Sequence, residues 1–421
     1  MKPLLQVPVT EVAALRALLA EALAGGPAVW PVPAAEPAGA EPAAATAPTP
    51  VAEVGDGVAV VVETSGSTAA PKRVLLSADA LRASAEASAA VLGGHGRWLL
   101  ALPGHYIAGV QVLVRGIVTG TPPAAMPPGE PFTAEGFAAA TARLMRLRDA
   151  LPRYTSLVPV QLARVVGAAE ADPSGDLARD LGRYAAILVG GQRVDPALVD
   201  RAAALGARVV RTYGSSETAG GCVYDGRPLP GVLARTVDGE LELGGPTLAD
   251  GYLDDPARTE AAFATDAAGL RWYRTGDLGS IDAEGVLRVR GRADDVITSG
   301  GVKVVLGEVE RAVQGVPAFA DAVAVAVPDP VWGERVAIVV SATADPGSDA
   351  LAALRTATDA AGLPPAARPV LVLRPPAGEL PRLASGKPDR VAASALARAA
   401  VSNGGDAPNT MSGWHARNPS A

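Results

Sequence analysis

The amino-acid sequence predicts an α/β protein with a large N-terminal domain and a small α+β C-terminal domain. Short apolar runs such as Val58–Val62 and Ala185–Val189 alternate with helical stretches, which favours β-α units and mostly parallel sheets. After residue 230, glycines and turns separate short strands, which indicates a β-rich subdomain of the large domain. Mixed helix and strand patterns return after residues 292–295, which predicts a domain boundary there.

The two ends of the chain show different patterns. The N-terminal stretch predicts an amphipathic helix that Thr10 caps and Gly25-Gly26 ends. Charged residues interrupt its apolar positions, so it does not resemble a secretory signal peptide. Residues 31–50 are rich in proline and alanine and are interpreted as a linker without a core of its own. Residues 401–421 are polar and contain glycine and proline, so we expect a disordered tail.

The remaining elements follow from local hydrophobic patterns. In the large domain, strands are predicted at Val58–Val62, Trp98–Leu102, Ser156–Val158 and Ala185–Val189, and helices near 77–92, 132–149, 159–169 and 195–205. In the small domain, strands are predicted at Ala322–Val327 and Arg335–Ser341, and helices near 306–314 and 348–361. We therefore expect an N-terminal domain over residues 1–293 and a C-terminal domain over residues 294–400.

Composition argues against several classes of partner. The chain has 421 residues and a formal net charge of −7, which disfavours a nucleic acid or an anionic membrane as partner. No uncharged apolar run reaches the roughly 20 residues of a membrane-spanning helix, so membrane insertion is not expected. Cys222 is the only cysteine, so no intrachain disulfide can form and a reducing cytoplasm is the expected compartment. The oligomeric state is left open, a homodimer included.

Lysine is rare in this chain, so the positions of Lys2, Lys72, Lys303 and Lys387 are informative. Lys72 closes the motif ETSGSTAAPK at residues 63–72. The motif is not a Walker P-loop, because the order G-x-x-x-x-G-K-[ST] is absent. Its backbone N–H groups and hydroxyls are nevertheless suited to phosphate oxygens, and Lys72 would add a positive charge. A tight strand-to-helix turn without a ligand is the alternative interpretation.

Four further motifs follow along the chain. They are TYGSSETAG at 212–220, WYRTGDLG at 272–279, GRADDVITSGGVKVVLGEVE at 291–310 and PRLASGKPDR at 381–390. Each has an ordinary structural alternative when it is taken alone. Glu217 could cap a helix, Asp277 could close an exposed turn, Arg292 could be a solvated surface residue and Lys387 an exposed loop lysine.

Together and in this order, the five motifs resemble those of the adenylate-forming superfamily, which includes acyl-CoA synthetases, peptide-synthetase adenylation domains and luciferases. The resemblance covers residues 58 to about 395. It implies that a carboxylate attacks the α-phosphorus of ATP to give acyl-AMP and pyrophosphate, and that the thiol of coenzyme A then displaces AMP. It also implies that the small C-terminal domain is mobile and rotates between the two steps about a hinge that matches Asp294.

The resemblance further implies which residues bind ATP. The residues that would hold the β- and γ-phosphates are Thr64, Ser65, Gly66, Ser67, Thr68 and Lys72. Gly190 and Gly191 of LVGGQRV would let the backbone approach the adenine and the acyl group. The residues of the adenine turn would be Tyr213, Gly214 and Ser216. Ala69 departs from the family pattern, which usually has glycine there, and this raises the alternative of a catalytically silent nucleotide-binding protein.

Other residues would carry the chemistry. Glu217 would bind Mg²⁺, a hard cation that prefers carboxylate oxygen. Asp277 and Arg292 would bind the ribose, and Lys387 would bridge the substrate carboxylate and the α-phosphate as negative charge builds. The residues near coenzyme A would be Gly300, Gly301 and Lys303. For Lys303, a solvated lysine on a strand is an equal alternative.

The stretch LPGHYIAGVQVLVRGIVTG at 102–120 bears on the acid substrate. Arg115 lies in an otherwise apolar stretch, where a guanidinium would meet an anion or reach solvent. The stretch resembles o-succinylbenzoate–CoA ligases of menaquinone biosynthesis in its spacing of His105, Gly109 and Arg115. This implies a dicarboxylic acid whose second carboxylate binds Arg115, with His105 lining the acyl pocket or serving as a structural loop residue. A ligase for another aryl or short-chain acid is the alternative.

Overall fold

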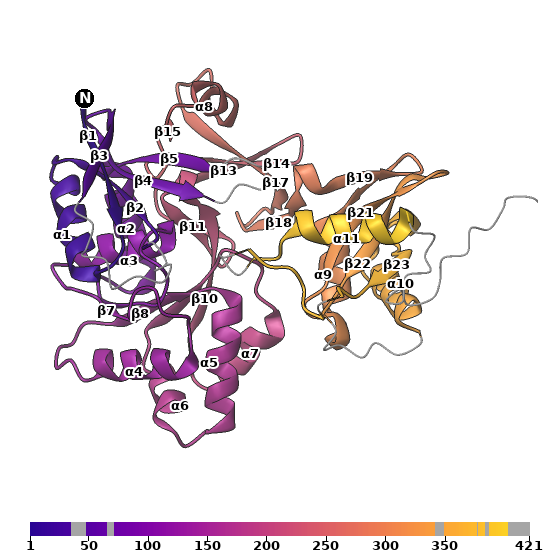
Figure 1. Cartoon of the computed structure of the whole chain (residues 1–421), viewed down its shortest axis with the longest axis horizontal. Helices are drawn as coiled ribbons and strands as arrows, with labels where there is room; N and C mark the ends of the chain where they lie inside the picture. The colour runs from indigo at the N-terminus through magenta and orange to yellow at the C-terminus, as the bar shows by residue number, and fades with distance from the viewer. Residues whose placement is uncertain (35–47, 65–70, 342–348, 377, 384–386, 403–421) are drawn as a thin grey trace, which may run out of the picture. The chain divides into compact units, whose positions relative to one another are not determined.

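The computed structural model describes residues 1–34, 48–64, 71–341, 349–376, 378–383 and 387–402 (Figure 1). The chain divides into two compact units. The first contains Met1–Arg235, Glu242–Thr275 and Ile281–Leu287, and the second contains Thr236–Leu241, Gly276–Ser280 and Arg288–Ala421. Sheets and helices alternate as predicted, so the α/β class is confirmed. None of the helices in the described ranges has the length and hydropathy of a membrane span.

One sheet of the first unit carries the loop of the first motif. Its strands, in spatial order, are β15 (Gly251–Tyr252), β5 (Lys72–Ser77), β4 (Val58–Thr64), β2 (Ala28–Val32), β1 (Lys2–Pro8) and β3 (Thr49–Val54). The linker interpretation of residues 31–50 is wrong at both ends, because β2 includes Pro31 and Val32 and β3 begins at Thr49. Residues 35–47 lie outside the described residues. Helix α1 (Val12–Leu23) begins after Glu11 without a side-chain cap, so the predicted Thr10 cap is wrong.

The other sheet of the first unit is the one that the β-α pattern predicts. Its strands, in spatial order, are β12 (Arg227–Pro228), β11 (Gly220–Tyr224), β10 (Val209–Ser215), β9 (Ala186–Val189), β8 (Arg153–Leu157), β6 (Arg97–Leu100) and β7 (Ala124–Ala125). Strands β10, β9, β8, β6 and β7 run parallel to one another. Parallel strands buried on both faces are mostly apolar, which is why short runs in the sequence identify them.

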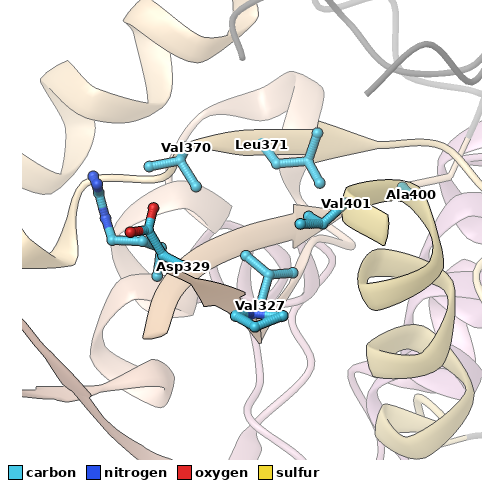
Figure 2. A pocket seen from close by; sticks show the side chains of 8 residues that line it. Val327, Asp329, Val370, Leu371, Ala400 and Val401 are labelled. Atoms are coloured by element: carbon cyan, nitrogen blue, oxygen red, sulfur yellow. The ribbon is translucent and has the colours of Figure 1, made fainter. Parts of the chain in front are cut away.

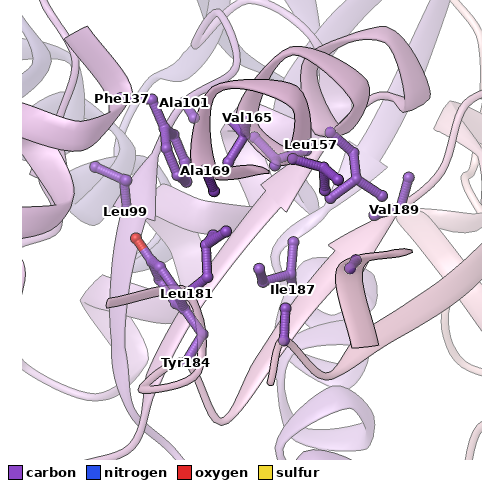
Figure 3. Packing of buried hydrophobic residues seen from close by; sticks show 14 of the residues in the cluster. Leu99, Ala101, Phe137, Leu157, Val165, Ala169, Leu181, Tyr184, Ile187 and Val189 are labelled. Atoms are coloured by element: carbon purple, nitrogen blue, oxygen red, sulfur yellow. The ribbon is translucent and has the colours of Figure 1, made fainter. Parts of the chain in front are cut away.

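Helices join these strands and cover them. They are α2 (Ala78–Leu92), α3 (Ile107–Val118), α4 (Ala134–Met145), α5 (Pro159–Ala171), α6 (Asp176–Leu181) and α7 (Pro196–Ala204). Local caps set several starts: the Ser77 hydroxyl accepts from the amide of Ala80, and Thr133 accepts from that of Gly136. Figure 3 shows the core beneath α4 and α5, where Phe137 and Val165 pack with Leu157 and Ile187 of the sheet.

A third sheet is built from strands that turns separate, as the pattern after residue 230 predicts. Its strands are β13 (Leu233–Val237), β14 (Glu240–Gly244), β17 (Arg271–Ile281) and β16 (Phe263–Thr265), in that order, and β18 (Leu287–Arg292) pairs with β17. Helix α8 (Pro256–Ala262) precedes β16. Strand β18 runs into the 3-10 turn η2 (Ala293–Asp295).

The second unit has its own sheet and two small cores. Its strands are β20 (Val302–Val305), β19 (Val296–Ser299), β22 (Gly333–Val339) and β21 (Val323–Asp329), with β23 (Leu371–Leu373) paired to β22. Its helices are α9 (Leu306–Gln314), α10 (Ala350–Ala360) and α11 (Arg390–Ser402). Val323, Val325 and Val327 pack under α11, whereas Ala324 between them packs under α9 and α10, the alternation expected of a strand buried on both faces.

The C-terminal end is helical further than the sequence predicts. Val401 and Ser402 belong to α11, so the predicted tail begins too early, and residues 403–421 lie outside the described residues. Figure 2 shows a small pocket between β21, β23 and the end of α11, lined by Val327, Val370 and Val401. It encloses about 10 Å³, the space of about one water molecule, and therefore cannot hold a nucleotide or an acyl group.

Candidate active site

The predicted phosphate loop connects two paired strands. Strands β4 and β5 are antiparallel, and Thr64 at the end of β4 pairs with Lys72 at the start of β5. The alternative of a tight strand-to-helix turn is therefore wrong, since β5 separates the loop from α2. The two ends of the loop are adjacent and fixed by the sheet. Residues 65–70, which include Ser65, Gly66, Ser67, Thr68 and Ala69, lie outside the described residues.

The turn that carries Glu217 is held from behind by two helices. Strand β10 ends at Ser215, and the 3-10 turn η1 (Ser216–Thr218) leads to Ala219, which has a left-handed backbone with φ of 51°. The Ala219 carbonyl accepts hydrogen bonds from Ser84 Oγ of α2 at 3.1 Å and from Gln111 Nε2 of α3 at 2.8 Å. Because all three groups are buried, these bonds fix the turn against α2 and α3.

Glycines let neighbouring protein atoms lie close to the backbone near this turn. A Cβ at Gly214 would lie 2.2 Å from the Gly220 carbonyl oxygen, and one at Gly190 would lie 2.2 Å from Thr212 Oγ1. Gly191 follows with φ of 79°, a left-handed conformation that favours glycine. Tyr213 lies on β10 between Thr212 and Gly214 and is half-buried. The ends of β9 and β10 thus bring the predicted adenine residues to neighbouring strands.

The Glu217 carboxylate is buried and has a neutral partner. The residue is 5% exposed, and its Oε1 accepts a hydrogen bond from the Tyr252 hydroxyl at 2.9 Å. Burial raises the pKa of the Tyr252 phenol, and the charge of Glu217 raises that pKa further, so Tyr252 stays a donor. No lysine or arginine in the described part of the chain forms an ion pair with Glu217. The helix-cap alternative therefore does not describe what its side chain contacts.

Tyr252 joins Glu217 to the phosphate loop, and sequence patterns did not identify it. The Lys72 ammonium lies 5.7 Å from the centre of the Tyr252 ring, within range of a cation–π contact. Strand β15 places Tyr252 there by pairing with β5, where Tyr252 is opposite Val74. The only local signal for this residue is an aromatic side chain in the turn-rich segment 250–255. Lys72, Tyr252 and Glu217 thus form one cluster from three separate segments.

Arg115 is buried in the described structure, which excludes the solvated alternative. It is 5% exposed, and its guanidinium carbon lies 4.5 Å from the centre of the Trp98 ring. Its Nη2 donates to Ser88 Oγ at 3.1 Å and to the Tyr224 hydroxyl at 3.3 Å. Its Nε has no hydrogen-bond partner, and no carboxylate of the residues placed in the structure lies within ion-pair distance. A buried cation without an anion is costly, and an anionic ligand would lower that cost.

His105 lies in the segment just before α3, the helix that carries Arg115. It is half-buried, and its ring centre lies 4.2 Å from that of Tyr106. Burial lowers the pKa of the imidazole, so it is neutral at neutral pH. These contacts are compatible with both the pocket-lining and the structural interpretation.

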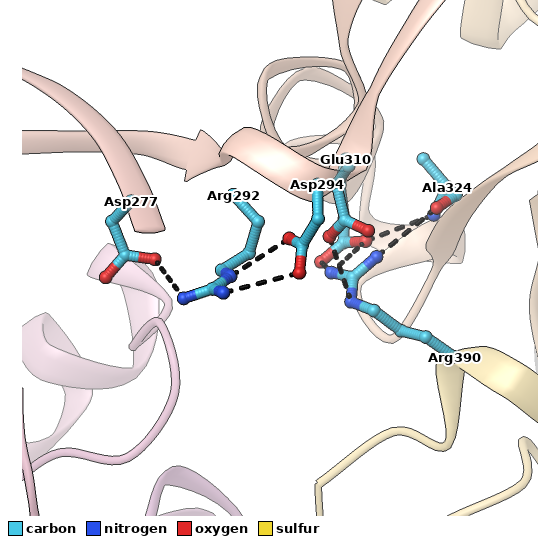
Figure 4. A network of polar contacts seen from close by, with 7 residues as sticks. Asp277, Arg292, Asp294, Glu310, Ala324 and Arg390 are labelled. Atoms are coloured by element: carbon cyan, nitrogen blue, oxygen red, sulfur yellow. Dashed lines mark hydrogen bonds and ion pairs between the residues drawn. The ribbon is translucent and has the colours of Figure 1, made fainter. Parts of the chain in front are cut away.

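In the second unit, Asp277 and Arg292 lie together. Asp277 is within strand β17 and its side chain is 18% exposed, so the expectation of an exposed turn is wrong. Arg292 Nη1 lies 3.3 Å from Asp277 Oδ1, and Arg292 Nε lies 3.1 Å from Asp294 Oδ1 (Figure 4). Burial lowers the pKa of Arg292, but the two carboxylates outweigh it and the net shift is upward. The predicted ribose residues and the predicted hinge residue are therefore one connected group.

The remaining predicted residues of the second unit lie in a turn, on a strand and in a hairpin. Gly300 and Gly301 join β19 to β20 with φ of 56° and 83°, and a Cβ at Gly300 would lie 2.2 Å from the Trp332 ring. Lys303 is exposed on β20 and donates to Thr298 Oγ1 at 2.9 Å, as a solvated strand lysine would. Lys387 is exposed in a hairpin that a hydrogen bond from the Leu383 amide to the Lys387 carbonyl closes at 2.8 Å.

Comparisons with known proteins agree with the family that the five motifs indicate. Residues 9–253 match the family of AMP-binding enzymes, and residues 308–387 match the C-terminal domain of AMP-binding enzymes. A probable 2-succinylbenzoate–CoA ligase of Mycobacterium tuberculosis (strain ATCC 25618 / H37Rv) is 43% identical over 293 residues, which are 68% of this chain and 72% of the relative.

Solved structures resemble the chain as well. The o-succinylbenzoate CoA synthetase of Bacillus subtilis with the acyl-adenylate intermediate matches with a TM-score of 0.66 and 27% identity, over 79% of this chain and 68% of that one. The same enzyme with ATP and magnesium ion matches with a TM-score of 0.66 and 26% identity, over 79% and 69%. An amide bond synthetase of Marinactinospora thermotolerans matches with a TM-score of 0.69 and 27% identity, over 94% and 80%. The chain belongs to the family of AMP-binding enzymes.

Proposed function

We propose that the protein is an AMP-forming acid–CoA ligase that converts o-succinylbenzoate to o-succinylbenzoyl-CoA in menaquinone biosynthesis. The observation that supports this choice of substrate is the buried Arg115 guanidinium, which has no carboxylate partner among the described residues. Arg115 lies on the same helix as Gln111, which holds the turn of Glu217 through a hydrogen bond. The printed names of the Mycobacterium tuberculosis and Bacillus subtilis relatives support the same acid.

The first chemical step would form an acyl-adenylate. A carboxylate oxygen of the acid attacks the α-phosphorus of ATP, the bond to the β-phosphate bridging oxygen breaks, and pyrophosphate leaves. Lys387 would stabilise the negative charge that develops between the carboxylate and the α-phosphate. Thr64 and Lys72 flank the loop that would hold the leaving phosphates, with Ser65, Gly66, Ser67 and Thr68 between them.

The carboxylate of Glu217 in the first unit is suited to binding Mg²⁺. No group of three or more His, Cys, Asp or Glu side chains gathers in the ranges that the structure describes. Mg²⁺ usually binds one or two carboxylates together with substrate phosphates rather than an all-protein cage, and Glu217 offers such a carboxylate. When bound, Mg²⁺ would neutralise charge on the phosphates of ATP. Tyr252 would orient the Glu217 carboxylate by holding its Oε1.

The acid would bind beside α3, where Arg115 can pair with the carboxylate that is not activated. His105 would line the same pocket. Tyr213, Gly190, Gly191, Gly214 and Ser216 would contact the adenine, and Asp277 with Arg292 would bind the ribose. Each of these roles is proposed from the family pattern and from the positions of the side chains in their own unit.

The second step would transfer the acyl group to the thiol of coenzyme A, with AMP as leaving group. The C-terminal domain, residues 294–400, would rotate about Asp294 relative to residues 1–293 between the steps. Gly300, Gly301 and Lys303 would then face the thiol channel. The cytoplasmic location stays a prediction from the sequence, and the oligomeric state stays open, a homodimer included.

The test is a panel of acids with Mg-ATP and coenzyme A: o-succinylbenzoate, benzoate, succinate, a medium-chain fatty acid and several amino acids. Pyrophosphate release and the mass of acyl-CoA are measured together. We expect thioester with o-succinylbenzoate alone, and its loss in Lys387→Ala with ATP binding retained. Thioester with another acid would discard the proposed substrate, and adenylate without thioester would discard the ligase. Bound ATP without pyrophosphate release for any acid would favour a silent nucleotide-binding protein.

A further inference from the structure

A partly buried ion-pair network lies close in sequence to Lys387 and has no part in the chemistry described above. Its centre is Arg390, the first residue of α11. Arg390 Nη2 donates to both carboxylate oxygens of Glu310, at 2.9 and 2.8 Å, and Arg390 Nη1 donates to the Ala324 carbonyl at 3.3 Å. Arg390 Nε also lies 3.8 Å from Asp295 Oδ2. One guanidinium therefore ties α11 to α9, to β21 and to the turn η2 that holds Asp294.

The Glu310 carboxylate accepts hydrogen bonds from several protein groups. Its side chain is 16% exposed, and besides the contacts to Arg390 its Oε2 accepts from the Ala324 amide at 3.1 Å. Such charge-assisted bonds to a rigid guanidinium fix direction as well as distance. A carboxylate held in this way is suited to positioning its neighbours rather than to binding a ligand.

The segment between this network and Lys387 is short and stiffened. The Asp389 amide donates to the Pro381 carbonyl at 2.8 Å, and Asp389 Oδ1 caps α11 by accepting from the Ala392 amide at 2.9 Å. Together with the bond from Leu383 to the Lys387 carbonyl, these contacts close the base of the hairpin. Since Arg390 follows Lys387 by three positions, a movement of Arg390 would shift the lysine backbone.

We propose that Arg390 and Glu310 are positioning residues that fix the Lys387 hairpin to α9 and β21 and couple it to the hinge turn through Asp295. The inference rests on the proposed function, in which Lys387 acts in the adenylation step. The hairpin, Glu310, Arg390 and Asp295 move as one body when the chain turns at Asp294, so that Lys387 reaches the α-phosphate with its backbone already in place. Misplacement by about 1 Å is enough to cost on the order of 100-fold in rate.

The test compares the two half-reactions in Glu310→Gln and in Arg390→Lys, which keeps the charge but loses the planar fork. Adenylation is followed by pyrophosphate release with o-succinylbenzoate, and thioester formation by adding coenzyme A to a synthetic o-succinylbenzoyl-adenylate. We expect adenylation kcat to fall roughly 10- to 100-fold while the KM for ATP and the thioester rate change by less than about threefold. Asp359→Asn, which breaks the exposed pair with Arg368, is the matched control and should leave both rates unchanged.

Two further measurements separate positioning from general damage. Glu310→Gln combined with Lys387→Ala should be no slower in adenylation than Lys387→Ala alone, because the pair acts through the lysine. Tryptic cleavage after Arg382, which is exposed in the hairpin, should be at least about fivefold faster in Glu310→Gln, since the hairpin opens more often. The cleavage assay needs no activity.

Several outcomes would overturn the coupling: unchanged adenylation in both folded variants, equal losses in the two half-reactions, additive losses in the double variant, or unchanged cleavage after Arg382. A wild-type protein that forms no adenylate would instead overturn the proposed function. Cleavage after Arg382 would still decide whether Glu310 and Arg390 hold the hairpin.

Discussion

The charged residues Glu217 and Arg115 of the candidate active site differ in their partners from the charged residues around Arg390. In the first unit, the partners of Glu217 and Arg115 among the described residues are neutral hydroxyls, those of Tyr252, Ser88 and Tyr224. In the second unit, Arg390 faces the carboxylates of Glu310 and Asp295.

The difference indicates where ligands would add charge. A buried charge that lacks an opposite charge is unfavourable until a ligand supplies one, whereas a paired charge with several hydrogen bonds mainly holds structure. On this view Glu217 would bind a cation and Arg115 an anion, whereas Glu310 and Arg390 would position the Lys387 hairpin. The predictions below test this contrast.

The largest effect is expected for Glu217→Gln. The amide keeps the hydrogen bond from Tyr252 but removes the charge that would hold Mg²⁺, so adenylation should fall about 100- to 1,000-fold. The free energy of unfolding should change by less than about 1 kcal/mol, because no ion pair among the described residues is lost. Pyrophosphate release and thermal unfolding measure the two quantities. A large loss of stability would place Glu217 with the structural charges, and Glu170→Gln of the exposed pair with Arg201 is the control.

The next effect is expected for Arg115→Leu. The Ser88 and Tyr224 hydroxyls, which lie 2.9 Å apart, can still bond to each other, so we expect the variant to fold. Its kcat/KM for o-succinylbenzoate should fall on the order of 100-fold, because the second carboxylate loses its cation. A monocarboxylate analogue should lose far less. Equal losses for the two acids would exclude the second-carboxylate role.

For Glu310→Gln we expect a loss of stability as well as the loss of adenylation described above. The amide cannot accept both hydrogen bonds from Arg390, and the partly buried guanidinium loses a charge partner. The free energy of unfolding should fall by about 1–2 kcal/mol, measured by urea denaturation. A change as small as that of Asp359→Asn would show that the paired charges of the second unit contribute no more than a surface ion pair does.

The smallest effect is expected for Tyr252→Phe, which removes the neutral donor beside Glu217 and keeps the ring beneath Lys72. The Mg²⁺ concentration for half-maximal adenylation should rise about 3- to 10-fold at saturating acid, because the carboxylate is less well oriented. Titration of Mg²⁺ with pyrophosphate release as readout measures it, and Mn²⁺ binding in the presence of ATP gives a readout without turnover. An unchanged Mg²⁺ requirement would leave Tyr252 as a packing residue only.

Local patterns predicted much of the secondary structure and the motif order. Helix α2 begins where Ser77 caps it, and the apolar run at Ala185–Val189 becomes β9 of a parallel sheet. Strands β1 and β2 were missed, because α1 lies between them in the sequence and strands that acquire their partners from another segment have weak local signals. The family pattern located Glu217, Asp277 and Lys387, but it did not state what each side chain contacts.

By itself, the sequence determined the α/β class, the order of the five motifs and the presence of an arginine within an apolar stretch, since each can be recognised from local patterns. Only the tertiary structure decided that Tyr252 bonds to Glu217, 35 residues away, and that Arg390 bonds to Glu310, 80 residues away. Such pairs arise from strand pairing and helix packing, which bring distant segments together. The balance of charge around each buried group is therefore a property of the fold and not of any local stretch.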